Sequence, residues 1–538
     1  MTTQSPHEPV AHAGGIRGRW AEARLTLDLF RAQHEGAAGI QRRQQGRLHT
    51  LMAHARERSP YYRQLYRGLP ADPRLDLLPP VTKPELMADF DRWVTDPRIT
   101  RAGVEAFVAD PDRIGQAFLG RYFVCTTSGT TGDPGLFVHD EQAVAVYRAL
   151  ALRLDAEWLS PAQWLAIVRR GVRWAAVVGS GAHFAGVGWM ESERRRSRWR
   201  RSACRVFPVQ QRLDSLTGAL DAFDPAILTG YPSALLQLAR EQEHGRLHVH
   251  PVLVEPSGES MLPTERAAVA RAFRREVGEA YASSEFQVMA IECRQGWLHV
   301  MADWVVLEPV DADLRPTRPG ETSDTVLLTN LANSVQPIIR YDLGDRILAR
   351  PDPCLCGNPR PAIRVAGHDD VLHLSGTGGG IVEVLPLAIG SVVEGVPGLH
   401  RFQLVQSGPR TLRVRLEPTA GLTLDRIWPG VADALTRYLT GVGAQAELAL
   451  AAEPPEPSAR SGKSGRSSAS LRGSNGLGAG GASARSNCVR ARSDDIRLVD
   501  SVAIHLLTSA ISVSATTSSP VPRCRRSRPC VSTARRQQ

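Results

Sequence analysis

One ten-residue segment, from 126 to 135, constrains this chain more than any other. It reads Thr-Thr-Ser-Gly-Thr-Thr-Gly-Asp-Pro-Gly and follows the apolar, strand-like residues 122–125. Glycines let backbone N–H groups turn toward an anion, and hydroxyl side chains add donors that carry no charge. The segment therefore predicts a loop that holds phosphates, although such a run is also typical of a flexible turn. It is not a Walker A loop, because the spacing GxxxxGK[ST] is absent.

Two later segments favour the phosphate-binding interpretation. Residues 281–285 read Tyr-Ala-Ser-Ser-Glu, and residues 340–345 read Arg-Tyr-Asp-Leu-Gly-Asp. Tyr281 can stack on a base, Glu285 can hold Mg²⁺, and Asp345 can accept hydrogen bonds from ribose hydroxyls. Taken singly, Tyr281 is more typical of a core aromatic residue and Asp345 of a turn. Together with the loop, they supply what a nucleoside triphosphate needs.

In this order and spacing, the three segments resemble the adenylate-forming enzymes, in particular the phenylacetate–CoA ligase branch. The resemblance covers about residues 40 to 455. The phosphate loop matches over 127–134, and the other two motifs match over 281–285 and 340–345, with Ala282 where the family has glycine. Weaker similarities are Ser257, Gly258 and Glu259, where the family wraps adenine, and residues 181–184, where it lines the acyl pocket.

The resemblance implies a reaction. ATP and a carboxylic acid, aryl or arylacetic by analogy, would give an acyl-adenylate, and a thiol, usually that of CoA, would displace AMP. A carrier-protein thiol or an amine is an alternative acceptor. The protein would mainly position the reactants and stabilise charge on the phosphate, with Mg²⁺ bridging phosphate oxygens at Glu285. The implied site residues are Thr130, Glu285 and Lys463 for catalysis, Thr127, Ser128, Gly129, Thr130, Thr131, Gly132, Ser257, Gly258, Glu259, Tyr281, Ser284 and Asp345 for the nucleotide, His183, Phe184, Tyr231 and Ser283 for the acid, and Asp369 and Asp370 for the hinge.

The lysines of this chain carry information because there are only two, Lys83 and Lys463. The resembled family uses a lysine near its C-terminus to bridge the carboxylate and the α-phosphate. Lys463 lies in a Ser-Gly-Lys sequence at the expected place, and arginine would not be equivalent to it. We therefore expect Lys463 to be catalytic, and we expect Lys83 to be structural or simply exposed.

After Lys463 the chain changes character. The whole net charge of +10 lies between residues 455 and 538, in a segment rich in Ser, Arg and Gly. Such a composition cannot bury enough apolar surface to offset the entropy of ordering, so we expect a disordered tail. One interpretation is a basic arm for nucleic acid or an anionic surface. We prefer a frameshift just after Lys463, because arginine-rich, lysine-poor sequence is typical of a GC-rich gene translated out of frame.

Two departures from the family pattern raise a second hypothesis. The family's hinge reads Gly-Arg-x-Asp-Asp, whereas this chain has His368 directly before Asp369 and Asp370. A neutral histidine replaces a permanent cation poorly, although Arg364 could substitute for it in space. Asp133 occupies a position where the family commonly has lysine beside the triphosphate, and a carboxylate there repels phosphate. The alternative is therefore a catalytically impaired, nucleotide-binding paralogue.

The eight cysteines include a group with metal-ligand chemistry. Cys293 and His299 form C-x5-H, and Cys354 and Cys356 form C-x-C. Three thiolates and an imidazole suit tetrahedral Zn²⁺, and some members of the resembled branch carry such a site. The alternative is a cysteine-rich turn with Cys293 buried as a small apolar residue. The scattered spacing argues against a disulfide framework.

Charge and hydropathy bear on partners and location. The arginine-rich segment 194–201 could bind the phosphates of CoA or of a nucleic acid, but we expect a solvated helix face. Residues 1–15 have no apolar core, and no run reaches eighteen apolar residues, which predicts a cytoplasmic chain without a membrane partner. We expect small-molecule partners rather than nucleic acid, and a homodimer stays open.

The pattern of elements predicts an α/β protein. Residues 1–115 form the helical start of a large domain, with amphipathic stretches at 25–30 and 48–56. Residues 116–366 form an α/β core with parallel or mixed sheets, in which 164–168, 252–254 and 305–307 are expected strands. A small α+β lid occupies 367–454, with strands at 399–405 and 412–416 and a helix at 424–439. The tail occupies 455–538.

Overall fold

A computed structural model describes most of the chain. The described residues are 16–70, 72–127, 135–258, 261, 263–366, 372–384, 389–390, 392–393, 396–419 and 421–455. The chain divides into a unit from Met1 to Arg492 and a unit from Ser493 to Gln538, of which the second lies wholly outside these ranges. Several predicted features lie outside them too: Ser128, Gly129, Thr130, Thr131, Gly132, Asp133, Glu259, His368, Asp369, Asp370, Lys463 and the tail after Pro455.

The N-terminal region is helical, as its sequence predicts. Ser59 and Thr100 accept hydrogen bonds from Tyr62 N and Gly103 N and so cap two of its helices. The elements are α1 (Ile16–His34), α2 (Gly36–Arg58), α3 (Pro60–Leu65), η1 (Leu75–Leu77), α4 (Lys83–Ala88), α5 (Phe90–Trp93), α6 (Arg101–Val108) and η2 (Pro111–Arg113). These helices hold a distant segment, since the Tyr62 hydroxyl and the Trp93 indole N–H both donate to the carbonyl of Pro337.

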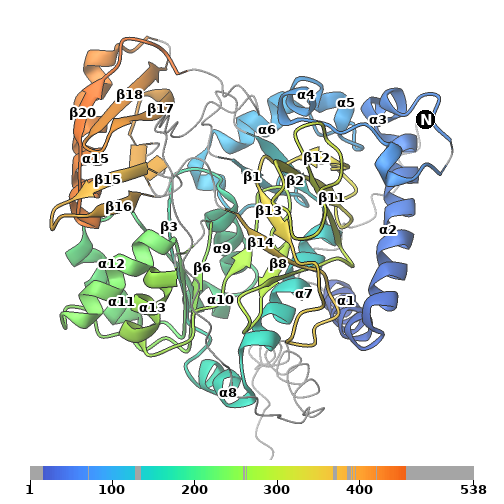
Figure 1. The fold of residues 1–538 in the computed structure, drawn as a ribbon, viewed down its shortest axis with the longest axis horizontal. Helices are drawn as coiled ribbons and strands as arrows, with labels where there is room; N and C mark the ends of the chain where they lie inside the picture. The colour runs from blue at the N-terminus through green and yellow to red at the C-terminus, as the bar shows by residue number, and fades with distance from the viewer. Residues whose placement is uncertain are drawn as a thin grey trace, which may run out of the picture. The chain divides into compact units, whose positions relative to one another are not determined.

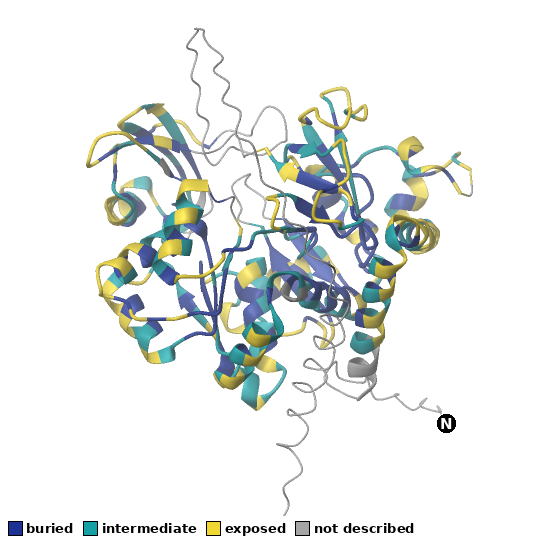
Figure 2. Ribbon diagram, turned by 60° about the horizontal axis from the view of Figure 1, so that its bottom comes forward, coloured by how far each residue is buried: buried dark blue, intermediate teal, exposed yellow. Residues whose placement is uncertain are grey.

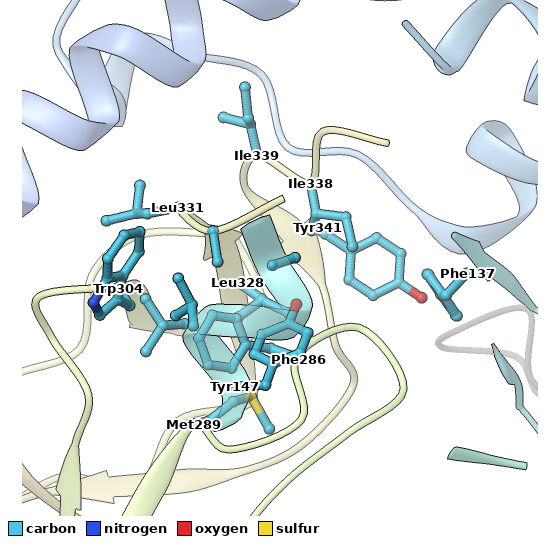
Figure 3. Packing of buried hydrophobic residues seen from close by; sticks show 14 of the residues in the cluster. Phe137, Tyr147, Phe286, Met289, Trp304, Leu328, Leu331, Ile338, Ile339 and Tyr341 are labelled. Atoms are coloured by element: carbon cyan, nitrogen blue, oxygen red, sulfur yellow. The ribbon is translucent and has the colours of Figure 1, made fainter. Parts of the chain in front are cut away.

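A large core joins these helices to three antiparallel sheets. One sheet pairs β1 (Phe123–Thr126) with β2 (Leu136–His139), and a second has the order β10 (Val305–Val310), β11 (Thr325–Asn330), β12 (Tyr341–Asp342). The third has the order β13 (Ile347–Ala349), β14 (Ala362–Val365), β9 (Leu298–Val300), β8 (Ala290–Glu292), β7 (Ala280–Tyr281). Helix α7 (Glu141–Trp158) contributes Tyr147, which packs on Phe286 near Met289 and Leu328 (Figure 3).

A parallel sheet forms the second core. Its order is β4 (Cys204–Pro208), β3 (Trp174–Val178), β5 (Ile227–Gly230), β6 (Leu253–Pro256). Its helices are α9 (Ala185–Arg195), α10 (Arg198–Ala203), α11 (Leu213–Phe223), α12 (Pro232–Glu243) and α13 (Pro263–Phe273). Figure 1 shows α11, α12 and α13 on one side of β3 and β6, and α9 on the other. Buried residues accordingly follow the strands, and exposed residues lie on the outer sides of the helices (Figure 2). The predicted α/β fold class is therefore confirmed.

One predicted strand is wrong. Residues 164–168 lie in helix α8 (Pro161–Arg169). Ser160 and Gln163 form a reciprocal capping box at its start, and Pro161 occupies the first turn, where its missing N–H costs nothing. A short apolar run does not distinguish a strand from a helix, whereas these start signals do. The expected strands at 252–254 and 305–307 are confirmed by β6 and β10, which begin within one residue of the predicted starts and continue beyond the predicted ends.

The C-terminal part has a core of its own, built from strands and one amphipathic helix. The strands are β15 (Leu372–Gly376), β16 (Ile381–Val384), β17 (Leu399–Gly408), β18 (Thr411–Pro418), β19 (Ala444–Gln445) and β20 (Glu447–Leu450), and the helix is α15 (Leu424–Val442). Val431 and Leu435 of α15 pack against Leu404 and Val414. The predicted α+β character and both predicted strands are confirmed. The limits proposed for the domains stay predictions.

Membrane insertion of a helix finds no support in the described residues. Among them, none of the helices combines the length and the apolar character that crossing a bilayer requires.

Candidate functional site

Strands β1 and β2 bring the two ends of the predicted phosphate loop together. Thr126 pairs with Leu136 in the antiparallel register. Beyond this pair, Thr127 N donates to Gly135 O at 3.0 Å, and Gly135 N donates to the Thr127 hydroxyl oxygen at 2.8 Å. Both bonds close the neck of the loop. The hydroxyl of Thr127 is thus part of the loop's own structure.

Lys83 lies at this neck, which the sequence does not indicate. Its ammonium nitrogen donates to the same Thr127 hydroxyl oxygen at 3.1 Å, from 44 residues away along the chain, and the side chain is half-buried. The expectation that Lys83 is merely structural or exposed misses this contact. The only signal in the sequence was the rarity of lysine, because spacing alone cannot place residues so far apart.

The backbone before Lys83 explains how it reaches the loop. Val81 N donates to Arg340 O at 3.0 Å, and Asp342 N donates to Val81 O at 2.9 Å, so Val81 pairs with the third motif. Lys83 then opens α4, where Thr82 and Glu85 form a capping box. The lysine and the motif at 340–345 are therefore held by one stretch of backbone pairing.

The second and third motifs are joined by two reciprocal hydrogen bonds. The Tyr281 hydroxyl donates to Asp345 Oδ2 at 2.5 Å, and the Tyr341 hydroxyl donates to Glu285 Oε1 at 3.0 Å. Each motif thus provides one tyrosine and one carboxylate, and each tyrosine binds the carboxylate of the other motif. Burial, followed by the neighbouring carboxylate, raises the pKa of both tyrosines well above the usual value, so both stay protonated donors.

Tyr281 and Arg340 carry structural contacts in addition to their predicted roles. Tyr281 is buried in the large core, and its stacking on a base stays a prediction. Arg340 is buried with φ 51°, a conformation that a non-glycine residue adopts rarely. Its side chain donates to Glu308, to Asp76 O and to Leu78 O. Arg340 therefore holds the N-terminal region against the motif.

Three of the four residues predicted to bind the acid, His183, Phe184 and Tyr231, lie in two places. Thr126 N donates to His183 O at 2.8 Å, which places His183 and Phe184 beside the end of β1. The His183 ring is buried, and its Nε2 donates to Asp110 O at 3.1 Å; burial lowers its pKa. Tyr231 lies at the carboxyl end of the parallel sheet, where its hydroxyl accepts from Gly179 N at 3.2 Å. That edge is where ligands bind in open parallel sheets.

Ser257 and Gly258 follow β6 at the same edge of the parallel sheet. Ser257 N donates to Gly230 O at 2.9 Å, and Gly258 has φ +83°, which favours glycine. Ser283 and Ser284 instead lie in the second motif. Ser283 N donates to Phe286 O at 3.0 Å, and Phe286 N donates to the Ser283 hydroxyl oxygen at 3.3 Å. The Ser284 carbonyl accepts from His139 at 3.0 Å. The nucleotide and acid roles of these four residues stay predictions.

The four predicted zinc ligands converge. The ligand atoms of Cys293, His299, Cys354 and Cys356 all lie within 4.8 Å of one another. Cys293 Sγ lies 3.8 Å from Cys354 Sγ, and Cys356 Sγ lies 3.2 Å from His299 Nε2. Cys293 follows β8 and His299 lies in β9, whereas both other cysteines lie in the loop between β13 and β14. The sheet brings these segments together because β9 pairs with both β8 and β14.

The surroundings of this cluster fit a metal. The Nδ1 atom of His299 donates to Arg360 O at 3.0 Å, which leaves Nε2 directed at the cysteines as a ligand. Burial lowers the pKa of His299, so its ring is neutral near pH 7, as metal ligation requires. Three thiols and one neutral imidazole are the donor set of a closed structural zinc site.

The arginine-rich segment is only in part the solvated helix face that its sequence predicts, since Arg195, Arg198 and Arg201 are exposed but Arg196 and Arg200 are half-buried. Glu193 is buried beneath it and pairs with Arg148, Arg196 and Arg200 at 2.7, 3.3 and 2.7 Å. Burial alone would raise the pKa of Glu193, but the three guanidinium groups outweigh it and hold the pKa well below its usual range. These arginines therefore neutralise an interior carboxylate, which weakens the case for a phosphate-binding patch.

Comparisons with known proteins give structural likenesses at low identity. No family model matches the chain, and no curated protein matches it. Similar solved structures include 2-hydroxyisobutyryl-CoA ligase with 2-HIB-AMP and CoA in the thioesterification state, at 21% identity over 79% of this chain and 89% of that chain, with a TM-score of 0.47.

Two further structures illustrate the range of these likenesses. One is the anthranilate CoA ligase AuaEII with anthranoyl-AMP, at 16% identity over 62% of this chain and 64% of that chain, with a TM-score of 0.31. The other is the amide bond synthetase McbA from Marinactinospora thermotolerans, at 14% identity over 62% of this chain and 66% of that chain, with a TM-score of 0.35. At these values we draw no functional argument from them.

Proposed function

We propose that this protein activates a carboxylic acid with ATP, forming an acyl-adenylate, and transfers the acyl group to a thiol, most simply that of CoA. The observation that carries the proposal is the pair of reciprocal tyrosine–carboxylate bonds between the motifs at 281–285 and 340–345. The contact between Lys83 and Thr127 at the neck of the hydroxyl-rich loop also supports the proposal.

Each contact suits a step of this reaction. The loop and the Lys83 ammonium would hold the phosphates of ATP, and Asp345 would accept from the ribose hydroxyls. Glu285 is the residue that would hold Mg²⁺, and the bound cation would stabilise the negative charge that builds up on the phosphate oxygens. Tyr341 orients that carboxylate through its hydroxyl. Lys463 would bridge the carboxylate of the acid and the α-phosphate, and Asp369 and Asp370 would form the hinge.

Lys83 also bears on Asp133, the residue that suggests an impaired enzyme. The family commonly places lysine at the position of Asp133, beside the triphosphate. Here the ammonium group of Lys83 reaches the neck of the loop from a different segment. A cation at this neck would attract bound phosphates and so oppose the repulsion expected from the carboxylate of Asp133. We therefore favour an active enzyme over the catalytically impaired paralogue, with an aryl or arylacetic acid as substrate.

The test is acid-dependent ATP–pyrophosphate exchange by the full chain, with pooled aromatic and aliphatic acids. We expect Glu285→Gln to lower exchange by about 100-fold or more, since a metal-held charge is lost in the transition state. Lys463→Ala tests the C-terminal lysine. Lys83→Ala should lower exchange about tenfold, and Lys83→Arg should restore part of it, because the charge returns without the compact ammonium.

Each result of this test decides between two functions. Exchange that needs an acid and is lost in Glu285→Gln supports the adenylating enzyme. Wild-type protein that binds ATP but shows no exchange with any acid would favour the impaired paralogue. Equal exchange by wild type and Lys83→Ala would contradict the proposal that Lys83 offsets the negative charge of Asp133.

We propose a structural zinc site as a second function of the chain, at Cys293, His299, Cys354 and Cys356. The convergence of their four ligand atoms within 4.8 Å supports it. Zinc there would tie the β8–β9 hairpin to the loop between β13 and β14. Metal analysis after gentle purification should return about one zinc per chain, as four protein ligands per ion require. A content well below that would contradict the site.

A further inference from the structure

A buried histidine of strand β2 contacts the second motif and has no part in the proposed reaction. His139 is 0% exposed. Its Nε2 atom lies 3.0 Å from Ser284 O, and its Nδ1 atom lies 3.2 Å from the Tyr147 hydroxyl. The ring therefore connects helix α7 to the backbone directly before Glu285, across 145 residues of sequence.

The chemistry of the partners fixes the direction of each hydrogen bond. A carbonyl only accepts, so Nε2 of His139 carries the proton and donates to Ser284 O. Burial lowers the pKa of His139 to about 4, so the ring is neutral and its Nδ1 accepts from the Tyr147 hydroxyl. That hydroxyl in turn accepts from Asn330 Nδ2 at 2.9 Å. Every polar atom of the His139 ring and of the Tyr147 hydroxyl has a partner.

Asn330 makes a second contact with the same motif. Its Nδ2 also donates to Glu285 O at 2.9 Å. Its Oδ1 accepts from Ala332 N and Asn333 N at 2.9 and 3.2 Å, which fixes the orientation of the amide group. The consecutive carbonyls of Ser284 and Glu285 are thus bound by two side chains that are themselves linked through Tyr147.

Packing holds this chain of hydrogen bonds rigid. The Tyr147 ring packs edge to face on Phe286 with centroids 5.0 Å apart, as Figure 3 shows. His139, Tyr147 and Asn330 are all fully buried. An unpaired buried polar group costs about 1–3 kcal/mol. Displacement of any one of these three side chains would leave its partner unpaired, so the network keeps all three in place. Cys125 lies 3.7 Å from Nε2 of His139, but burial raises the pKa of its thiol, so it stays protonated and unreactive.

We propose that His139 is a positioning residue: it fixes the carbonyl of Ser284 directly and is linked through Tyr147 to Asn330, which fixes the carbonyl of Glu285, so that the Glu285 side chain faces the nucleotide with Mg²⁺ bound. This inference rests on the proposed function, in which Glu285 holds the metal. It explains why a strand next to the phosphate loop ends in a buried polar ring. Misplacement of a catalytic group by about 1 Å can cost about 100-fold in rate.

Two substitutions that both introduce an amide side chain distinguish a positioning role of His139 from a role in core packing alone. His139→Gln places an amide nitrogen near the position of Nε2, so it keeps the bond to Ser284 O. His139→Asn is too short for that bond and keeps only the contact near Tyr147. Both variants lose the ring, so a purely structural role predicts similar behaviour from the two.

The readouts are the Mg²⁺ dependence of ATP–pyrophosphate exchange and the hydrogen–deuterium exchange of peptides that cover 281–286. For His139→Asn we expect exchange to fall about 10- to 100-fold and the Mg²⁺ concentration for half-maximal rate to rise severalfold. We also expect its 281–286 peptide to lose protection. His139→Gln should stay within about threefold of wild type, because it keeps the decisive hydrogen bond.

The outcomes are separable from those of the proposed function. Equal Mg²⁺ dependence and equal protection in the two variants would overturn the inference. If wild type shows no exchange activity, the proposed function fails, and the protection of 281–286 alone still decides whether His139 fixes this segment. If His139→Asn does not fold, His139→Met replaces it. The methionine side chain fills much of the space of the ring but has no donor for Ser284 O, so the same shift in Mg²⁺ dependence is expected, and its absence contradicts the inference.

Discussion

Two sites in this chain are assembled in different ways. The motif site draws on side chains far apart in sequence: Lys83 meets Thr127 across 44 residues, Tyr281 meets Asp345 across 64, and Asn330 meets Tyr147 across 183. The contacts of the Cys/His cluster span similar separations, 57 and 61 residues, but they come from two strands that pair directly and from one loop of the same sheet. The first depends on the whole fold, and the second depends on one edge of one sheet.

The two sites also differ in what holds them together. At the motif site, hydrogen bonds link tyrosine hydroxyls, carboxylates and an asparagine amide, most of them buried, so the removal of one partner leaves another unsatisfied. At the cluster, the thiols and the imidazole bind each other only weakly, and most of the stabilisation would come from a metal. Polar networks thus stabilise the motif site without a ligand, whereas the cluster needs one. The predictions below test this difference, from the largest expected effect to the smallest.

Loss of one cysteine should produce the largest effect. Cys354→Ser should abolish zinc binding and lower the free energy of unfolding by about 3–5 kcal/mol, less than the ~10–16 kcal/mol of isolated zinc-finger peptides, because these strands also pair without metal. Leu355→Ser is the matched control, since that side chain lies in the same loop and is 84% exposed. Calorimetry and metal content measure both. A similar loss of stability in the two variants would contradict metal-dependent stabilisation.

The His139 network should make stability depend on acid pH. Burial lowers the pKa of His139 to about 4, while the Ser284 carbonyl and the charge of Asp140 oppose the shift. Between pH 6.5 and 4 the unfolded state binds the proton and the folded state does not, so the unfolding free energy falls as pH falls. The loss amounts to about 3 kcal/mol for this group and is complete below pH 4.

Denaturant titrations at pH 7, 5.5 and 4.5 measure this dependence. Carboxylates also titrate in this range, so the informative quantity is the difference between wild type and His139→Gln. That difference should shrink as pH falls, because the variant has no imidazole to protonate. A difference independent of pH would show that His139 keeps its ordinary pKa in the folded state.

The two reciprocal tyrosines should give the smallest effects, and unequal ones. Tyr341→Phe leaves a carboxylate oxygen of Glu285, which is 5% exposed, without its donor, and should cost about 1–3 kcal/mol of stability. Tyr281→Phe should cost less than about 1 kcal/mol, because Asp345 is half-buried and water can replace the hydroxyl. Thermal unfolding of both variants measures the difference, and a larger loss for Tyr281→Phe would reverse the predicted order.

The sequence predicted local structure well where strong local signals exist. The N-terminal helices, strands β6, β10, β17 and β18, and helix α15 all follow from apolar periodicity and turn residues. The error at 164–168 arose because five apolar residues fit either period, and the capping box at Ser160 and Gln163 decided the matter. The grouping of Cys293, His299, Cys354 and Cys356 was also predictable, since few residue types bind zinc.

Contacts across long stretches of chain were not predictable. Lys83 carried no spacing signal toward Thr127, and nothing in the sequence near His139 indicates its contact with Ser284. Glu193 gave no sign that it would be buried among three arginines, because a run of charges is usually solvated and its partner Arg148 lies on another helix. In each case the decisive contact depends on how helices and sheets pack.

The sequence by itself determined the α/β class, the three motifs and the cysteine–histidine set, because backbone preference and side-chain chemistry act over a few residues. Only the tertiary structure decided that Tyr281 and Tyr341 each bind the other motif's carboxylate, that Lys83 reaches the loop, and that His139 holds Ser284. Those pairings depend on the need to satisfy every polar group that folding buries, and that requirement is set by packing rather than by local sequence.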